Sequence, residues 1–146
     1  MRNGLILGSA LFACACSGIP RDPEGTLERV RAERAFKVGV IARGAAVSAA
    51  ELAFLRNVER ATGARAAIET GSAENLLLRL EEGGLDLVVG PFGTRTPWIT
   101  RVSFVPPPDK RKAGEGVLLP SAAARNGENG WIALLHGEAD ALGGGQ

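Results

Sequence analysis

Apolar and polar positions alternate along residues 26–142 in blocks that predict helices and strands in turn. Charged segments with apolar residues at helical spacing are separated by almost continuous apolar runs, which are typical of strands buried inside a parallel sheet. The pattern predicts strands over residues 36–41, 64–70, 85–90, 102–105 and 116–119, and helices over 26–34, 48–63, 72–83 and from 126–129 onward. Strand, helix, strand, helix, strand at this spacing indicates parallel βαβ units with right-handed crossovers.

The predicted helix after the first strand carries the clearest local signals. Ser48 and Glu51 have the spacing of a capping box, in which the hydroxyl and the carboxylate each accept a hydrogen bond from an otherwise unpaired backbone N–H. Val47 and Leu52 occupy the positions of a hydrophobic staple, and Gly63 is a typical helix end. Four residues at helical spacing predict the buried face of this helix: Leu52, Leu55, Val58 and Ala61.

Two further helices have apolar faces that can be assigned from the sequence. Ser72 is a suitable N-cap for the next helix, whose apolar side chains are Leu76, Leu77 and Leu80. The last helix carries Trp131, which we predict to be a core anchor. His136, the one histidine of the sequence, lies near the end of that helix, and we expect it to be exposed.

The N-terminal residues differ from the rest of the chain. A short positive start is followed by an apolar run over residues 4–13, which is too short to span a bilayer but suits a signal peptide. The run ends in Leu11-Phe12-Ala13-Cys14, which resembles the lipobox of bacterial lipoproteins. That resemblance implies that Cys14 is diacylated and becomes the mature N-terminus, with Cys16 offering a second register. A metal or redox pair at Cys14 and Cys16 is the alternative, but the sequence holds no other cysteine to complete a site.

These signals divide the chain into three parts. We predict a lipoprotein signal peptide over residues 1–13, a flexible tether over 14–25 and one folded domain over 26–142. The predicted location is the periplasm, with a lipid anchor in the cell envelope, and the outer membrane if the cell has two membranes.

Composition narrows the classes of function. The formal net charge is +1, no basic run occurs, only 5% of residues are aromatic and tyrosine is absent, so nucleic acid is not an expected partner. The sequence contains no nucleophile elbow, no zinc-protease motif, no phosphate loop and no dinucleotide fingerprint. We therefore predict that the chain is not an enzyme and that it needs neither a metal nor a cofactor.

Several segments together resemble bacterial solute-binding proteins of family 3, the polar-amino-acid type that serves ABC transporters. The segments that carry the resemblance are residues 26–31 with 36–40, residues 80–90, residues 94–104 with Thr96-Pro97-Trp98, and the stretch Gly127-Glu128-Asn129-Gly130-Trp131. The resemblance implies an α/β fold: a single three-layer lobe of a type II periplasmic-binding-protein-like fold, with a mostly parallel five-stranded sheet and one antiparallel strand.

Family members have two lobes joined by hinge strands, and this chain has room for one. The outgoing hinge strand would be residues 102–106 and the returning one residues 116–120, with only a polar turn over 109–115 between them. A second lobe needs on the order of 100 residues. We therefore expect a first lobe whose partner lobe is excised near 109–115, with the two hinge strands paired antiparallel.

The resemblance and the fold class place candidate ligand residues after the first and third strands. In open α/β sheets ligands bind outside the carboxyl ends of the strands. Five residues are the candidates there: Arg43, Thr94, Arg95, Thr96 and Trp98. Either arginine could meet an anionic group of the ligand. The alternative is that Trp98 packs under the turn and both arginines are solvated. Family members usually have an arginine directly after Thr-Pro-x, where this sequence has Ile99, and Arg101 comes two positions later.

Two hypotheses of function follow. The first is an envelope-anchored lipoprotein that binds a small polar solute or amino acid, either as the substrate-binding component of an amino-acid-type ABC transporter, with the permease as partner, or as a single-lobe derivative with weak binding. The second is a non-enzymatic interaction module that binds another envelope protein, or a degenerate remnant of a two-lobe binding protein.

Overall fold

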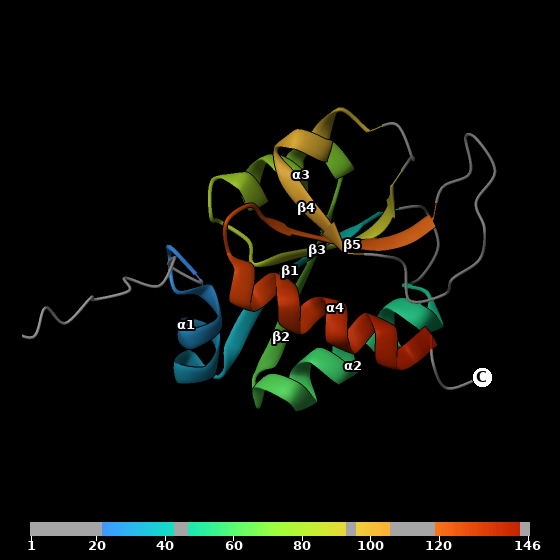
Figure 1. Ribbon diagram of the computed structural model, residues 1–146. Helices are drawn as coiled ribbons and strands as arrows, with labels where there is room; N and C mark the ends of the chain where they lie inside the picture. Colours follow the sequence, from blue (N-terminus) through green and yellow to red (C-terminus); the bar gives the residue numbers. More distant parts are fainter. Residues whose placement is uncertain (1–21, 43–46, 93–95, 106–118, 144–146) are drawn as a thin grey trace, which may run out of the picture.

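The computed structural model describes residues 22–42, 47–92, 96–105 and 119–143. The helices and strands follow one another along the chain in the predicted order (Figure 1). The elements are α1 (Thr26–Glu33), β1 (Ala35–Ile41), α2 (Ala49–Thr62), β2 (Arg65–Gly71), α3 (Ala73–Glu81), β3 (Leu87–Phe92), the 3₁₀ helix η1 (Pro97–Thr100), β4 (Val102–Val105), β5 (Leu119–Arg125) and α4 (Asn129–Gly143). The predicted signal peptide over 1–13 lies outside the described residues, as do Cys14, Cys16 and the stretch near 109–115 where we predict that a second lobe is excised.

The strands form one sheet in the order β2-β1-β3-β5-β4. Strand β1 is parallel to both β2 and β3, whereas β5 is antiparallel to its two neighbours β3 and β4. The sheet therefore contains one antiparallel strand among five, which confirms the predicted fold class. Because parallel neighbours end at the same edge, the carboxyl ends of β1, β2 and β3 lie together.

Helices cover both faces of the sheet and make three layers. The larger core cluster joins α1, α2 and α4 to one face, and Trp131, which is fully buried there as predicted, packs edge-on against Phe36 with 5.8 Å between ring centroids. The smaller cluster joins α3 to the other face through Leu76, Leu77 and Leu80, which confirms the predicted apolar face of that helix. Figure 1 shows α3 on the side of the sheet opposite to α2 and α4.

Helix α2 begins and ends where the sequence predicts, but its buried face is different. The Glu51 N–H donates to Ser48 Oγ over 3.2 Å and the Ser48 N–H donates to Glu51 Oε2 over 2.8 Å, which confirms the capping box. The prediction that Leu52 and Ala61 are buried is wrong, because both are exposed. Phe54, the largest apolar side chain of the helix, turns into the core and rotates the buried stripe, which is formed by Glu51, Phe54, Leu55, Val58 and Thr62.

Strand β5 also differs from its prediction. The antiparallel pairing with β4 is confirmed, but the partners of β4 are residues 122–125 rather than 116–119, with Val102 opposite Arg125 and Val105 opposite Ala122. Ala122 and Ala124 belong to the larger core cluster and Ala123 to the smaller one, so small side chains alternate between the two faces. Alanine is not enriched in strands, so these residues gave no signal for a strand in the sequence. The strand forms because side chains pack against it from both faces of the sheet.

Candidate functional site

The carboxyl edge of the parallel strands is the place where the sequence predicts a ligand. Strand β1 ends at Ile41 and the adjacent β3 ends at Phe92, so the segments that follow them leave from neighbouring positions. The Ala42 N–H donates to the Gly71 carbonyl over 2.9 Å, which brings the end of β2 to the same edge. Arg43, Thr94 and Arg95 lie outside the described residues, and their joint role stays a prediction.

Three helices start at this edge and are capped by hydroxyl groups. Ser48 caps α2 after β1, and Ser72 caps α3 after β2 with a hydrogen bond of 3.4 Å from the Asn75 N–H. Thr96, one of the predicted site residues, caps η1 after β3 and accepts a hydrogen bond of 3.3 Å from the Trp98 N–H. The edge therefore presents helix N-termini, which favour an anionic ligand.

Trp98 lies at the border of the smaller core cluster. Its side chain is half-buried and packs against that cluster. The guanidinium carbon of Arg101 lies 4.3 Å from the ring centroid of Trp98. Arg101 also donates two hydrogen bonds to the carboxylate of Glu81, one from Nε to Oε1 over 3.0 Å and one from Nη2 to Oε2. Arg101 is therefore committed to an ion pair and a cation–π contact.

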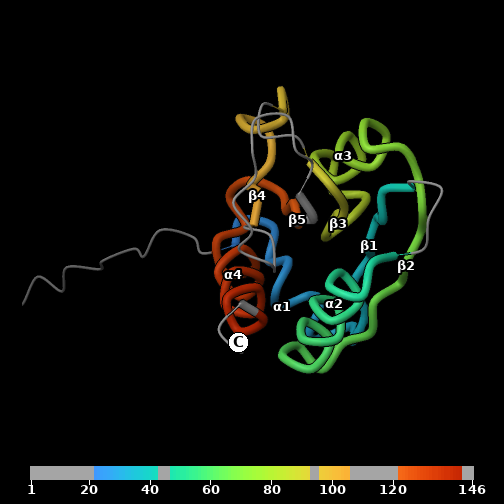
Figure 2. The backbone as a smooth tube through the Cα atoms, turned by 90° about the vertical axis from the view of Figure 1, so that its right-hand side faces the viewer, coloured from blue at the N-terminus to red at the C-terminus, as the bar shows by residue number. Residues whose placement is uncertain are grey.

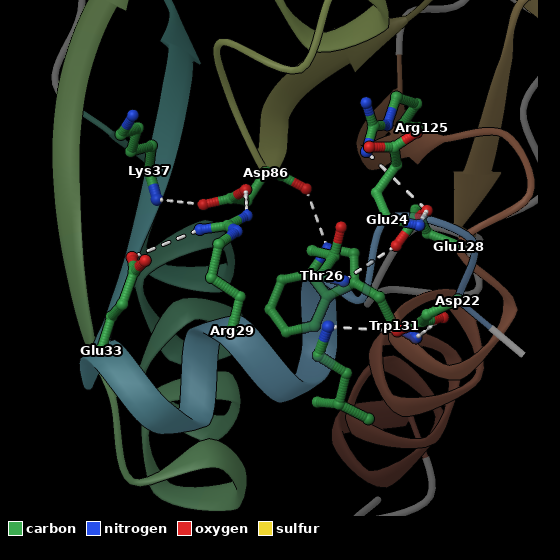
Figure 3. Close-up of polar contacts among 11 residues, drawn as sticks. Asp22, Glu24, Thr26, Arg29, Glu33, Lys37, Asp86, Arg125, Glu128 and Trp131 are labelled. Atoms are coloured by element: carbon green, nitrogen blue, oxygen red, sulfur yellow. Dashed lines mark hydrogen bonds and ion pairs between the residues drawn. The ribbon is translucent and has the colours of Figure 1, made fainter.

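The amino edge of the sheet holds a polar network that the sequence analysis did not identify (Figure 3). Asp86 lies just before β3 and is only 6% exposed. Its carboxylate pairs with Arg29 and accepts a hydrogen bond of 2.8 Å from the Lys37 N–H, and its carbonyl accepts one of 2.8 Å from Trp131 Nε1. Burial by itself would lower the pKa of Arg29, but the hydrogen bond and charge of Asp86 raise this pKa above its ordinary value.

Glu128, at the start of the segment leading into α4, is the second buried carboxylate of the network. It is 1% exposed and accepts hydrogen bonds of 2.9 Å from the Glu24 N–H and 3.0 Å from the Thr26 N–H, with Arg125 at 3.7 Å. Burial by itself would raise the pKa of Glu128, but the hydrogen bonds from Thr26 and Glu24 and the charge of Arg125 outweigh it. The pKa of Glu128 is therefore held below its ordinary value.

Asp22 connects the N-terminal segment to two helices. Its Oδ1 accepts hydrogen bonds of 2.6 Å from the Gly130 N–H and 3.2 Å from the Trp131 N–H, and its Oδ2 accepts one of 3.1 Å from the Leu27 N–H. One carboxylate thus satisfies backbone donors in the first turns of both α1 and α4. The predicted tether over 14–25 is corrected here, because residues 22–25 belong to the folded domain, while residues 14–21 lie outside the described ranges.

The buried carboxylates of the network are hydrogen-bonded within the protein. A cleft of about 440 Å³ opens beside the network, lined by side chains of both charges that include Glu24, Arg29, Glu33, Lys37, Glu82 and Arg125. Within the described residues every buried side-chain nitrogen or oxygen has a hydrogen-bond partner. Its buried carboxylates therefore serve the fold itself. The sequence analysis singled out residues 80–90 and 127–131, which contain Asp86 and Glu128 of this network, as motifs of the family resemblance. Nothing in the sequence indicated that the two segments lie close together.

Comparison with known proteins shows the fold. No family profile matches the chain, and no curated protein matches it. Among solved structures, the arginine-bound form of domain 1 of the T. maritima arginine-binding protein, TmArgBP, has a TM-score of 0.64 at 12% identity, covering 77% of this chain and 97% of that chain.

An ancestral cationic amino-acid solute-binding protein has a TM-score of 0.62 at 9% identity over 80% of this chain and 93% of that chain. The periplasmic domain of B. pertussis BvgS has a TM-score of 0.56 at 12% identity over 83% of this chain and 44% of that chain.

These likenesses define the chain as one lobe of a periplasmic-binding-protein fold. The first of these neighbours is a domain of an arginine-binding protein and the second is an amino-acid solute-binding protein. Within the described ranges, no group of three or more His, Cys, Asp or Glu side chains is placed to hold a metal ion. No helix of the described residues is long and apolar enough to cross a bilayer.

Proposed function

We propose that this chain is a single-lobe solute-binding domain that binds an amino acid or a similar small polar solute at the carboxyl edge of β1 and β3. The observation that carries the proposal is the fold match to domain 1 of TmArgBP, which covers 97% of a one-domain chain whose crystal structure has arginine bound. A single lobe of this fold therefore suffices for binding in that protein. The same fold here brings the ends of β1 and β3 to one edge, and the predicted site residues follow these two strands in the sequence.

The chemistry of this edge suits the carboxylate of a solute. Arg43 follows β1 and Arg95 follows β3, so each could offer a forked pair of N–H donors to the same anion. The hydroxyls of Thr94 and Thr96 add neutral hydrogen-bonding groups, and the ring of Trp98 adds an apolar wall. Since one face of the solute stays in water, we expect affinity no tighter than about millimolar.

Calorimetry on the whole chain tests this proposal. The titrants are arginine, glutamate, glutamine and serine, with a sugar as a solute that has no carboxylate. We expect heat of binding for at least one amino acid, and its loss in Arg43→Ala or Arg95→Ala. Arg31→Ala, which removes an exposed arginine of α1, is the matched control and should bind as the wild type does. Absence of binding for every amino acid at tens of millimolar would contradict the proposal.

The location and the transporter partner are part of the same proposal. Support comes from Leu11-Phe12-Ala13-Cys14 after an apolar run, which predicts a lipid anchor that would hold the domain at an ABC permease. Labelled palmitate should enter the wild-type chain and be absent from Cys14→Ser. Label that persists in Cys14→Ser but disappears in Cys16→Ser would move the anchor to the second register.

The interaction module is the second candidate, and one observation favours it. Ile99 on η1 is 64% exposed beside the half-buried Trp98, and exposed apolar side chains next to one another can form a contact with another protein. A pull-down from solubilised envelope with wild type and Ile99→Asp separates the two functions. If a partner binds the wild type but not Ile99→Asp, and calorimetry detects no solute binding, then protein binding rather than solute binding is the function of this domain.

A further inference from the structure

Strand β2 is an edge of the sheet, and nothing in the described part of the chain pairs with its outer side as a strand. In Figure 2 its trace follows the outer rim of the molecule. The Arg65 N–H donates to Arg34 and the Gly71 carbonyl accepts from Ala42, so the odd-numbered residues of β2 face β1. The backbone groups of Ala66, Ile68 and Thr70 therefore point outward, because neighbouring residues of a strand alternate in direction.

This edge carries few of the features that keep sheet edges from pairing. The sequence of β2 is Arg-Ala-Ala-Ile-Glu-Thr-Gly, without proline or lysine, and Ile68 is 49% exposed. A sheet edge whose backbone N–H and C=O groups point outward is a template for another strand. The described residues protect this edge in two ways: β2 carries the charged side chains of Arg65 and Glu69, and the carboxylate Oε1 of Glu59 on α2 accepts a hydrogen bond of 2.9 Å from the Ala66 N–H.

The strand is complementary to itself in one antiparallel register. If two copies meet about a two-fold axis at Ala67, then Arg65 stands opposite the partner's Glu69, and Ala66 stands opposite the partner's Ile68. An axis at Glu69 would instead oppose like charges, and an axis at Ile68 would leave the charges unmatched. The self-complementary pattern is what a closed two-fold interface requires.

We propose that β2 is a homodimerisation edge: two copies pair antiparallel about Ala67 and make one continuous sheet, with Glu59 restraining the association. In this register the outward groups of Ala66 exchange hydrogen bonds with those of the partner's Ile68. Glu59 must release the Ala66 N–H first, so the dimer competes with a hydrogen bond of the monomer. Glu69 also pairs with Arg79 of its own chain. Its carboxylate has two oxygens, so it can accept hydrogen bonds from Arg79 and from Arg65 of the second copy at the same time.

Sedimentation equilibrium of the full chain over a range of concentrations tests this edge. The weight-average mass should rise above the 15.2 kDa of one chain as the concentration increases. Glu59→Ala should strengthen the association because it removes the competing acceptor, whereas Glu59→Gln keeps an acceptor and should behave as the wild type does. A mass that stays at one chain in both wild type and Glu59→Ala would overturn the proposal.

Charge reversal then tests the register. Arg65→Glu and Glu69→Arg should each weaken the dimer by about tenfold or more, since each places like charges opposite one another at both ends of the interface. The double variant Arg65→Glu, Glu69→Arg restores opposite charges and should restore the dimer. Arg31→Glu, on α1, is the control with the same change of net charge as Arg65→Glu. Melting curves should show that every variant is folded. If neither Arg65→Glu nor Glu69→Arg weakens the dimer, the interface does not lie at this edge.

Discussion

Glu128 joins residues that are far apart in the sequence, and its chemistry makes that link testable. Its two oxygens accept the N–H groups of Glu24 and Thr26 in a buried position. The amide of Glu128→Gln offers one acceptor and one donor, so one of these N–H groups would lose its partner. We expect a loss of about 1–3 kcal/mol of unfolding free energy at neutral pH, measured by urea unfolding.

The pH dependence of this variant has a definite sign. Because the pKa of Glu128 is lower in the folded than in the unfolded chain, its stabilisation is present above the unfolded value and is lost as pH falls through the folded value. The difference between wild type and Glu128→Gln should therefore be largest near neutral pH and shrink in acid. Glu138→Gln on α4 is the control. A difference that grows on acidification would contradict the assignment.

Gly90 lies in β3 where two parallel strands approach closely at the carboxyl edge. A Cβ at this position would be 2.7 Å from Cβ of Ile41, which cannot move without shifting β1. We expect Gly90→Ala to lower the unfolding free energy by about 1–3 kcal/mol through overpacking, measured by denaturant unfolding. Gly137→Ala on α4 has open space around it and should instead stabilise the helix by about 0.5–1 kcal/mol. Two effects of equal sign would contradict the packing argument.

At the scale of elements, the two N-caps of α2 and α3 should differ in strength. Ser48 has a reciprocal partner in Glu51, whereas Ser72 makes a single bond of 3.4 Å to the Asn75 N–H. We expect Ser48→Ala to cost about 1 kcal/mol and Ser72→Ala less, in denaturant unfolding. Threonine at position 48 keeps the hydroxyl and should retain most of the stability. A larger loss of unfolding free energy in Ser72→Ala than in Ser48→Ala would show that the capping box of Ser48 and Glu51 contributes little to stability.

Elements set by local chemistry were predictable, and those set by distant packing were not. The box at Ser48 and the apolar stripe of α3 depend on neighbours within one or two turns, so the sequence is sufficient. The strand at Ala122–Ala124 depends on two core clusters that meet it from opposite faces. The polar residues at the two edges of the sheet divide in the same way. Thr96 is found from its Thr-Pro motif, whereas Glu128 reaches backbone groups more than 100 positions away, which no periodicity indicates.

At the scale of the molecule, the two edges of the sheet have different tasks. The amino edge holds Asp22, Asp86 and Glu128, which tie the N-terminal segment to α1, β3 and α4 (Figure 3). The carboxyl edge presents the capped helix starts and the segments that we propose bind a solute. Asp22, the first described residue, therefore lies at the edge opposite the one that we propose binds a solute.

The attachment of residues 22–25 leads to a prediction about where the domain begins. A chain that begins at Asp22 should unfold in one cooperative transition. A chain that begins at Thr26 loses the caps that Asp22 provides to α1 and α4 and the hydrogen bond from Glu24 to Glu128. We expect the shorter chain to be less stable by about 1–3 kcal/mol in urea unfolding.

Asp22→Ala in the longer chain separates the side chain from the length of the segment. Asp22 supplies acceptors for three backbone N–H groups, so this variant should reproduce most of the loss seen in the shorter chain. Pro23→Ala is the control, because Pro23 is exposed and its ring forms no hydrogen bond. Equal stability of the chains that begin at Asp22 and Thr26 would instead place the start of the domain at α1 and make residues 22–25 part of the tether.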